Sequence, residues 1–376
     1  MTTREPTAID AIAEAYTDKL AALDPISATS MGIKGFDHLM TDLSPQGHAE
    51  RADLDRATLR ELDAVAPVDA VDRVTLAAMR ERLGLQVELY EAGEPFADLN
   101  VIASPLQGLR DVLDLMPTET TDDWAGIASR LAKVPDAVRG YIASLREGVS
   151  RGLVPARLQV TEGVKQAAEL ADPASSFFVG FADGATPDGA AASGALANDL
   201  ARAGRDAAAA YGELERFLAD ELAPHAPGRD AVGRERYALW SRYFVGAAVD
   251  LDETYEWGLE ELQRMADEQD AIIREIAGPD ATIDDAIAVL DADPARKLHG
   301  KPALREWMQA TADEAIRALD GVHFDIPEPV REIECMIAPT ENGGIYYTGP
   351  SDDFTRPGRM WWSVPPGVTE FSTWRE

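Results

Sequence analysis

Cysteine is almost absent from this sequence, with Cys335 as the only one among 376 residues. A single cysteine excludes an intramolecular disulfide and any zinc site built from several thiolates. The alternation of residues 331–338 places Cys335 on the apolar side of a strand, so we expect a buried structural thiol rather than a nucleophile. A chain without disulfides fits a reducing compartment, and we therefore expect a cytoplasmic protein.

Lysine is also scarce, because it accounts for only six of the 35 basic residues, which face 67 acidic ones. A net charge of −32 repels the phosphates of nucleic acids and anionic membrane surfaces, so neither is expected as a partner. The acidity indicates a solvated surface, and an acidic cleft for cationic substrates is the alternative interpretation. The sequence contains no run of about 18 apolar residues, so no membrane span is expected. The first residues lack the apolar core of a signal peptide.

The sequence also lacks the common catalytic motifs. It contains no H-E-x-x-H, G-x-S-x-G, P-loop or G-x-G-x-x-G pattern. No two of the five histidines have the spacing of a shared metal on one helix. These histidines are His38, His48, His225, His299 and His323. We therefore predict no catalytic residue, no metal ligand and no cofactor site within this chain.

Helical periodicity is what the sequence holds in abundance. Residues 252–276 give the clearest amphipathic pattern, and Thr282 and Asp285 have the spacing of a capping box at the next helix. The length favours about two domains or one large helical body. We expect a mainly α protein. Its predicted parts are an N-terminal helical region (1–178), a connection (179–194), a second helical region (195–329) and a small β-layer with the start of a further helix (330–376).

The pattern changes from helical to alternating near residue 330. Residues 331–338, 345–348 and 359–364 are strand candidates, and Asn342-Gly343 is a turn signal. Together they predict a small antiparallel sheet near the C-terminus, over about residues 331–364. This sheet is the only β-layer that the sequence predicts.

The last four residues resemble the opening of a helix. Thr373 and Glu376 have the spacing of a capping box. In this motif the threonine hydroxyl accepts a hydrogen bond from the backbone N–H three residues later, and the glutamate side chain accepts one from the backbone N–H of the threonine. No helix follows them in the sequence. We therefore expect the sequence to be a truncated piece of a longer protein.

Aromatic side chains gather on the predicted strands. Tyr346-Tyr347 and Trp361-Trp362 are adjacent pairs, and neighbouring residues of a strand point to opposite faces. One ring of each pair is therefore expected in the core. The other ring of each pair is available to line a cleft.

Two arginines flank a turn between the last two predicted strands. Arg356 and Arg359 lie on either side of a Pro-Gly pair. Their guanidinium groups are suited to receive a carboxylate. As loop arginines, they are equally suited to pair with Asp352 and Asp353.

Several segments, taken in order, resemble a bacterial family. They are Asp24-Pro25-Ile26-Ser27-Ala28-Thr29, Asp42-Leu43-Ser44-Pro45, Ser104-Pro105-Leu106-Gln107, Tyr255-Glu256-Trp257-Gly258, residues 344–351, Arg356-Pro357-Gly358 and residues 367–376. Through them the whole chain resembles the bacterial domain-of-unknown-function family 885, whose members look like helical zinc metallopeptidases. In that family the T-W-R-E segment, here residues 373–376, leads into a helix that carries an H-E-x-x-P-G-H-H motif.

The resemblance implies zinc as the cofactor of the full-length family and none held by this chain. The metal ligands and the general base would lie beyond residue 376, so no catalytic and no metal residue is transferred to this sequence. The resemblance transfers only the strand layer ahead of the motif, where a strand would pair with an extended substrate. The substrate-cleft candidates are Ile345, Tyr346, Tyr347, Thr348, Arg356, Arg359, Trp361 and Trp362.

The favoured function is a truncated metallopeptidase-like hydrolase, which would cleave peptide bonds with a zinc-activated water in its full-length form and be inactive as given. One alternative is half of a two-polypeptide enzyme, in which a separate C-terminal fragment supplies the zinc helix. A second alternative is an acidic helical binding or scaffold protein that uses the aromatic strands as a docking surface. The expected partners are a peptide or a small-molecule substrate.

Overall fold

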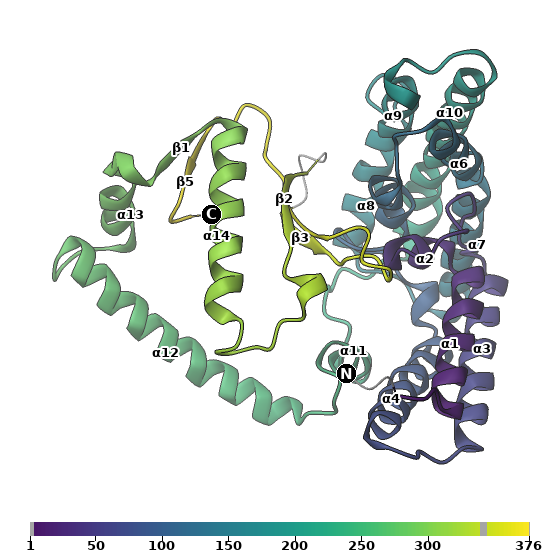
Figure 1. The fold of residues 1–376 in the computed structure, drawn as a ribbon, viewed down its shortest axis with the longest axis horizontal. Coiled ribbons are helices and arrows are strands. Elements are labelled where there is room, and N and C mark those ends of the chain that lie inside the picture. Colours follow the sequence, from purple (N-terminus) through teal and green to yellow (C-terminus); the bar gives the residue numbers. More distant parts are fainter. Residues whose placement is uncertain (1–3, 339–343, 376) are drawn as a thin grey trace. The chain divides into compact units, whose positions relative to one another are not determined.

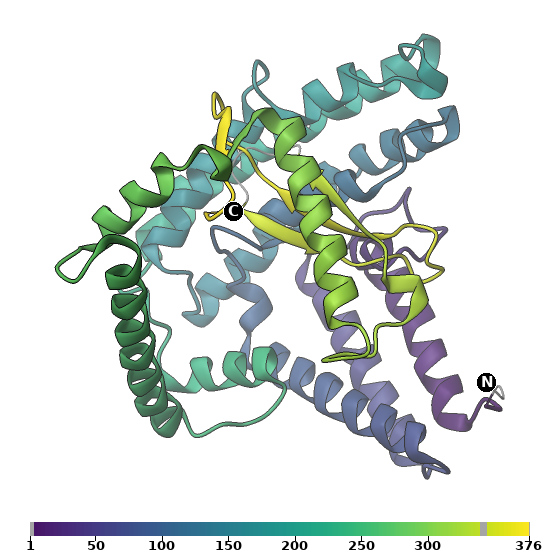
Figure 2. The same ribbon diagram turned by 60° about the vertical axis from the view of Figure 1, so that its left-hand side comes forward.

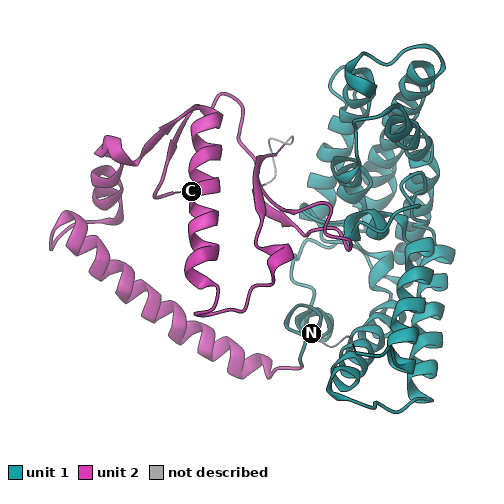
Figure 3. Cartoon of the chain, viewed as in Figure 1, with its two compact units in different colours: residues 1–247 teal, residues 248–376 magenta. Residues whose placement is uncertain are grey.

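The structure, a computed structural model, describes residues 4–338 and 344–375. These residues form two compact units, residues 1–247 and residues 248–376 (Figure 3). The prediction of a mainly helical chain with a small antiparallel sheet near the C-terminus is confirmed. No helix among the described residues is both long and apolar enough to cross a membrane.

Unit 1 is built from helices joined by loops (Figures 1 and 2). Its α-helices are α1 (Ala8–Leu23), α2 (Pro25–Met31), α3 (Pro45–Asp63), α4 (Ala70–Ala92), α5 (Pro105–Asp111), α6 (Thr121–Leu131), α7 (Val134–Arg151), α8 (Arg157–Ala171), α9 (Phe177–Asp183), α10 (Gly194–Arg216) and α11 (Arg234–Val245). Shorter turns of 3-10 or π-helix are η1 (Glu94–Phe96), η2 (Val112–Leu115), η3 (Pro187–Gly189), η4 (Phe217–Leu222) and η5 (Ala223–His225).

The core of unit 1 surrounds α10, which packs against α6, α7, α8 and α9. Small residues on α10, such as Ala203 and Ala207, are buried and allow its neighbours to approach closely. Tyr211 is fully buried and its hydroxyl donates to the Leu106 carbonyl at 2.6 Å. Because α10 packs on the helices before it, residues 179–194 lie inside unit 1, and the two compact units divide at residues 247–248.

A buried cation holds the loop between α2 and α3. Arg130 on α6 is 0% exposed, although it carries a guanidinium group. Its Nε donates to the Leu39 carbonyl at 2.7 Å, and its Nη2 donates to the carbonyls of Phe36 at 3.0 Å and Pro25 at 3.3 Å. Burial lowers the pKa of Arg130 to about 10, so the group stays charged at neutral pH. Arg130 therefore ties two backbone carbonyls of this loop, and one of α2, to α6.

Unit 2 combines helices with two small sheets. Its elements are α12 (Leu251–Ala277), α13 (Ile283–Ala292), η6 (Pro294–Arg296), β1 (Lys297–His299), α14 (Gly300–Leu319), η7 (Glu328–Val330), β2 (Ile333–Ile337), β3 (Ile345–Thr348), β4 (Gly358–Trp362) and β5 (Glu370–Ser372). The capping box predicted at Thr282 and Asp285 is confirmed at the start of α13. Helix α12 is amphipathic as predicted, but most of its apolar side chains are exposed, and Leu262 and Met265 are 64% and 53% accessible.

The larger sheet has three strands in the order β2-β4-β3. Strands β3 and β4 are antiparallel, whereas β2 runs parallel to β4. The predicted turn at Asn342-Gly343 lies outside the described residues. Helix α14 lies across one face of this sheet (Figures 1 and 2).

The smaller sheet pairs β1 with β5 in antiparallel register, and the sequence did not predict it. Directly after β5, the Thr373 N–H donates to the Arg296 carbonyl at 2.8 Å. Arg375 connects the end of the chain to α13, because its Nη2 donates to the Asp291 carboxylate at 2.6 Å. Glu376, the second member of the predicted capping box, lies outside the described residues.

Candidate functional site

One face of the three-stranded sheet forms the core of unit 2. Strand register places Cys335, Met360 and Trp362 on this face, where Leu304 and Met308 of α14 cover them. Cys335 is 0% exposed, and burial raises the pKa of its thiol. The prediction of a buried thiol is therefore confirmed. The expected division of each aromatic pair into one core ring and one open ring is wrong, because Trp361 and Trp362 are both buried and Tyr346 and Tyr347 are both exposed.

The opposite face of the sheet carries an aromatic and polar cluster. The rings of Tyr346 and Trp361 are stacked, with centroids 6.1 Å apart and planes inclined by 13°. Trp361 Nε1 donates to the Thr348 hydroxyl at 3.0 Å, which fixes the indole on the strand. Beside them, Arg359 Nε donates to Glu334 Oε2 at 2.7 Å. Tyr346 is 37% exposed and Trp361 only 7%, so Tyr346 is the accessible ring of this face, next to an ion pair.

Strand β3 lies at one edge of this sheet. Ser363 N–H donates to the Gly344 carbonyl at 3.1 Å, and hydrogen-bonded pairs alternate along an antiparallel ladder. The N–H and C=O groups of Ile345 and Tyr347 therefore point away from β4, toward the edge. Their side chains are 55% and 51% exposed. Within the described residues, this edge is open to another extended chain.

Gly358 makes room for the ring of Tyr347. A Cβ at position 358 would lie 2.1 Å from the Tyr347 hydroxyl and 2.8 Å from the ring carbon that bears it. No other residue fits at this position unless the ring moves. The glycine therefore determines where the Tyr347 side chain lies along the edge strand.

The structure brings seven of the eight predicted cleft residues together in one sheet. Arg356 is the exception, because it lies in the loop before β4, where its backbone N–H donates to the Ser351 hydroxyl at 2.9 Å. Arg359 was expected to receive a ligand carboxylate or to pair with Asp352 or Asp353. In the structure it forms an ion pair with Glu334.

Glu334 is a site residue that the sequence reasoning missed. The parallel register of β2 and β4 sets Glu334 opposite Arg359. These two residues are far apart in the sequence, so only the strand register reveals the pair. The alternation of residues 331–338, which separates Glu334 from the apolar face, was the one available signal.

Metal binding finds no support in the described part of the chain. Within residues 4–338 and 344–375, no three His, Cys, Asp or Glu side chains are grouped to hold a metal ion. The donor set of a zinc site is therefore not formed by these residues. What the site offers is a hydrogen-bonding strand edge and aromatic side chains on both faces.

Two solved structures share this fold. A candidate lipoprotein from Colwellia psychrerythraea aligns with a TM-score of 0.74 and 16% identity, over 95% of this chain and 68% of that chain. A candidate lipoprotein of unknown function from Shewanella oneidensis aligns with a TM-score of 0.60 and 14% identity, over 97% of this chain and 65% of that chain. The chain thus spans about two thirds of the length of these relatives, and identities this low show the fold alone.

No curated protein matches the sequence. The family model described as "Bacterial protein of unknown function (DUF885)" matches residues 25–376. This match includes unit 2 with its strand layer and nearly all of unit 1. The resemblance seen in the sequence segments is therefore confirmed, and the protein belongs to the bacterial family of unknown function DUF885.

Proposed function

We propose that this protein binds an extended peptide along the edge of β3, as the substrate-binding part of a zinc-dependent, peptidase-like hydrolase. The observation that carries the proposal is the outward direction of the Ile345 and Tyr347 backbone groups at a sheet edge. An added strand gains main-chain hydrogen bonds at such an edge, and pockets on each face select its side chains.

The side chains around the edge suit this role. Ile345 and Tyr347 offer exposed apolar surface on one face of β3. On the other face Tyr346 offers its exposed ring, which is stacked on the buried Trp361. An extended peptide places alternate side chains on opposite faces, so it would meet an apolar surface with each set. Peptides with alternating apolar side chains are therefore the expected ligands.

Zinc belongs to this proposal only through the family resemblance. Because the described residues group no donor set for a metal, we derive no catalytic step from them. The relatives of known structure are longer by about a third of their own length, which leaves room in them for ligands and base. For this chain, we expect neither stoichiometric zinc nor peptide turnover. Metal analysis and a peptidase assay on the purified protein test this expectation, and bound zinc with turnover would contradict it.

Binding of a labelled hexapeptide with alternating apolar and polar residues tests the strand-edge proposal directly. Tyr347→Pro removes an outward N–H, and proline is tolerated on edge strands whose N–H faces away from the sheet. Tyr347→Ala is the matched control, because it removes the ring and keeps the N–H. We expect the proline variant to bind more weakly than the alanine variant, by about tenfold. Equal affinities of the two variants would overturn the proposal.

The cytoplasmic location stays a prediction that rests on the single, buried Cys335. Fractionation of the producing bacterium tests it. Recovery with the membrane or the periplasm would contradict it.

A further inference from the structure

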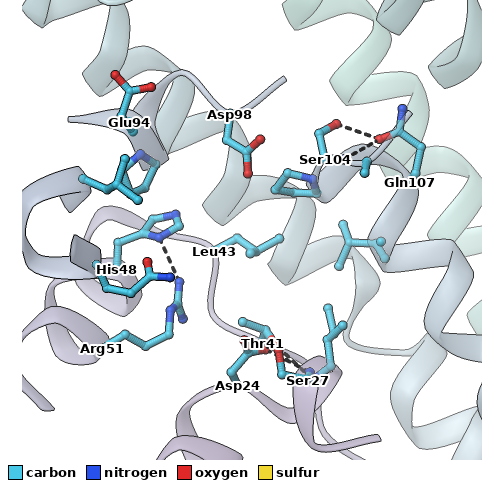
Figure 4. Close-up of a pocket in the computed structure, with 18 of the residues that line it drawn as sticks. Asp24, Ser27, Thr41, Leu43, His48, Arg51, Glu94, Asp98, Ser104 and Gln107 are labelled. Atoms are coloured by element: carbon cyan, nitrogen blue, oxygen red, sulfur yellow. Dashed lines mark hydrogen bonds between the residues drawn. The ribbon is translucent and has the colours of Figure 1, made fainter. Parts of the chain in front are cut away.

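A cavity of about 480 Å³ lies wholly among residues of unit 1 (Figure 4). Its walls come from α2, α3, α4, η1, α5 and α11 and from the loops between them. This volume is in the range of small-molecule sites. This cavity was not predictable from local sequence patterns, because its lining residues come from segments spread between residues 24 and 243.

Apolar side chains make up much of the cavity wall. Leu43 and Leu109 are buried and line it from the loop before α3 and from α5. Leu89 of α4 and Trp240 of α11 line it as well. Two hydrogen bonds hold parts of this wall: the Ser144 hydroxyl donates to the Leu43 carbonyl at 2.6 Å, and Trp240 Nε1 donates to Glu94 at 2.8 Å. The wall is therefore formed without a ligand.

Most charged groups of the cavity already have partners within the protein. Asp24 accepts hydrogen bonds from the hydroxyls of Ser27 at 2.7 Å and Thr41 at 2.5 Å. Glu94 is 4% exposed and accepts from both Nε and Nη2 of Arg236, at 2.6 and 2.7 Å. Asp24 thus has two hydroxyl donors, and the charge of Glu94 is balanced by the Arg236 guanidinium.

His48 and Arg51 satisfy each other. Arg51 Nη2 lies 2.9 Å from His48 Nδ1, and because a guanidinium only donates, Nδ1 accepts and carries no proton. Burial, and then the charge of Arg51, lowers the pKa of His48 to about 4, so its ring is neutral at pH 7. Arg51 also donates to the Asp42 carbonyl at 2.9 Å. The Arg51 guanidinium therefore uses its hydrogen-bond donors on groups of the protein itself.

Asp98 differs from the other charged lining residues. Within the described residues, its carboxylate makes no hydrogen bond, and Figure 4 shows it between Glu94 and Ser104 on the cavity wall. Its backbone is fixed from behind, because the buried Tyr141 hydroxyl donates to the Asp98 carbonyl at 2.6 Å. Burial and the nearby charge of Glu94 raise the pKa of Asp98 to about 6, so it is mainly ionised at pH 7. An ionised carboxylate in such a place requires a donor from a ligand or from water.

We propose that this cavity binds a small molecule with a protonated amine and an apolar body, with the amine on Asp98 and the body against Leu43, Leu89 and Leu109. The remaining acids of the wall are neutralised or hydrogen-bonded within the protein, so Asp98 supplies the uncompensated charge that selects a cation. A buried amine–carboxylate contact is stronger than a neutral hydrogen bond, which favours an amine over an alcohol of the same shape. This site is separate from β3 and does not depend on the function proposed for it.

Calorimetric titration of the full chain with hexylamine, benzylamine and their alcohol counterparts hexanol and benzyl alcohol tests the proposal. The protein is unchanged in this comparison, so folding of a variant plays no part. We expect at least one amine to bind about tenfold more tightly than its alcohol at pH 7. Equal affinities of amine and alcohol, or no binding of either amine at about 10 mM, would overturn the proposal.

A matched pair of variants assigns the effect to the cavity. Asp98→Asn keeps the shape of the side chain and removes its charge, so the preference for amine over alcohol should disappear. Asp136→Asn removes the same charge from an exposed site on α7 and should keep the preference. Binding of the amine to Asp98→Asn with wild-type affinity would overturn the proposal, as would an equal loss in both variants.

Discussion

The ring of Tyr347 on β3 lies against Gly358 on β4, so closely that a Cβ at position 358 would come within 2.1 Å of the Tyr347 hydroxyl. The two residues belong to neighbouring strands, and Tyr347 is also the residue whose N–H and C=O point to the open edge. The position of an exposed ring at the proposed peptide site is therefore set by a glycine in the strand behind it. The same glycine offers a way to move the ring without changing the edge.

Gly358→Ala is expected to displace the Tyr347 ring and to weaken peptide binding, because the new Cβ occupies the place of the hydroxyl. Because the Tyr347 ring is 51% exposed and can turn toward solvent, the change in stability should stay within about 0.5 kcal/mol. Gly349→Ala is the control, since a Cβ there meets no atom within 4 Å. Peptide affinity and urea unfolding of both variants check the prediction. Equal peptide affinities of the two variants would show that the Tyr347–Gly358 contact has no role in binding.

Two ion pairs with similar geometry are predicted to differ in their contribution to stability. Glu94 pairs with Arg236 through two hydrogen bonds and is 4% exposed, whereas Glu221 pairs with Arg146 through two hydrogen bonds of 2.8 Å on the surface. Glu94→Ala should lower the free energy of unfolding by about 3–5 kcal/mol, because it leaves the Arg236 guanidinium without its buried partner.

Glu221→Ala should change stability little, since water replaces an exposed partner. Urea unfolding of both variants measures the difference. A loss in Glu221→Ala as large as that in Glu94→Ala would mean that burial of Glu94 does not set the strength of its pair.

Asp98 should make stability fall as the pH rises. Its pKa in the folded protein is about 6, above the ordinary 3.8, so between these values the folded state binds the proton more tightly than the unfolded state. The contribution is fully present below about pH 4 and is lost as the pH rises through 6. Asp98→Asn should therefore gain stability relative to the wild type between pH 4 and pH 7, on the order of 1–3 kcal/mol.

The contribution of His48 to stability changes with pH in the direction opposite to that of Asp98, so His48 serves as the internal control. Its folded pKa of about 4 lies below the ordinary 6.5, so the unfolded state binds the proton more tightly, and stability is lost as the pH falls below 6.5. His48→Gln should therefore lose stability relative to the wild type as the pH rises from 4 to 7. Unfolding measured across this range separates the two groups, and a difference that is independent of pH in both variants would contradict the assigned shifts.

Local patterns in the sequence were enough to predict much of unit 2. The capping box at Thr282, the burial of Cys335 and the strands around residues 335, 346 and 361 all follow from spacing and alternation within a few residues. The amphipathic pattern of α12 was also visible. An amphipathic pattern does not show which element covers the apolar face of a helix. The exposure of Leu262 and Met265 on α12 was therefore evident only in the structure.

Features that join distant segments were not predictable. The pairing of β1 with β5 links three-residue strands about 70 residues apart, and strands this short give no alternation to detect. The pair of Glu334 with Arg359 depends on a parallel register, which the sequence does not encode locally. The cavity around Asp98 needs α3, α5 and α11 together, and each lining residue is ordinary in its own segment.

The most direct test of the central claim, that β3 binds an extended peptide, changes the peptide and leaves the protein intact. Two labelled peptides of one sequence, with alternating apolar and polar residues, are N-methylated either at the apolar or at the polar positions. The alternation fixes the register, and a paired strand uses only every second N–H toward its neighbour. Fluorescence anisotropy should show that one methylated peptide binds like its parent and that the other loses about tenfold or more in affinity. Equal binding by both methylated peptides, or an equal loss in both, would contradict the claim.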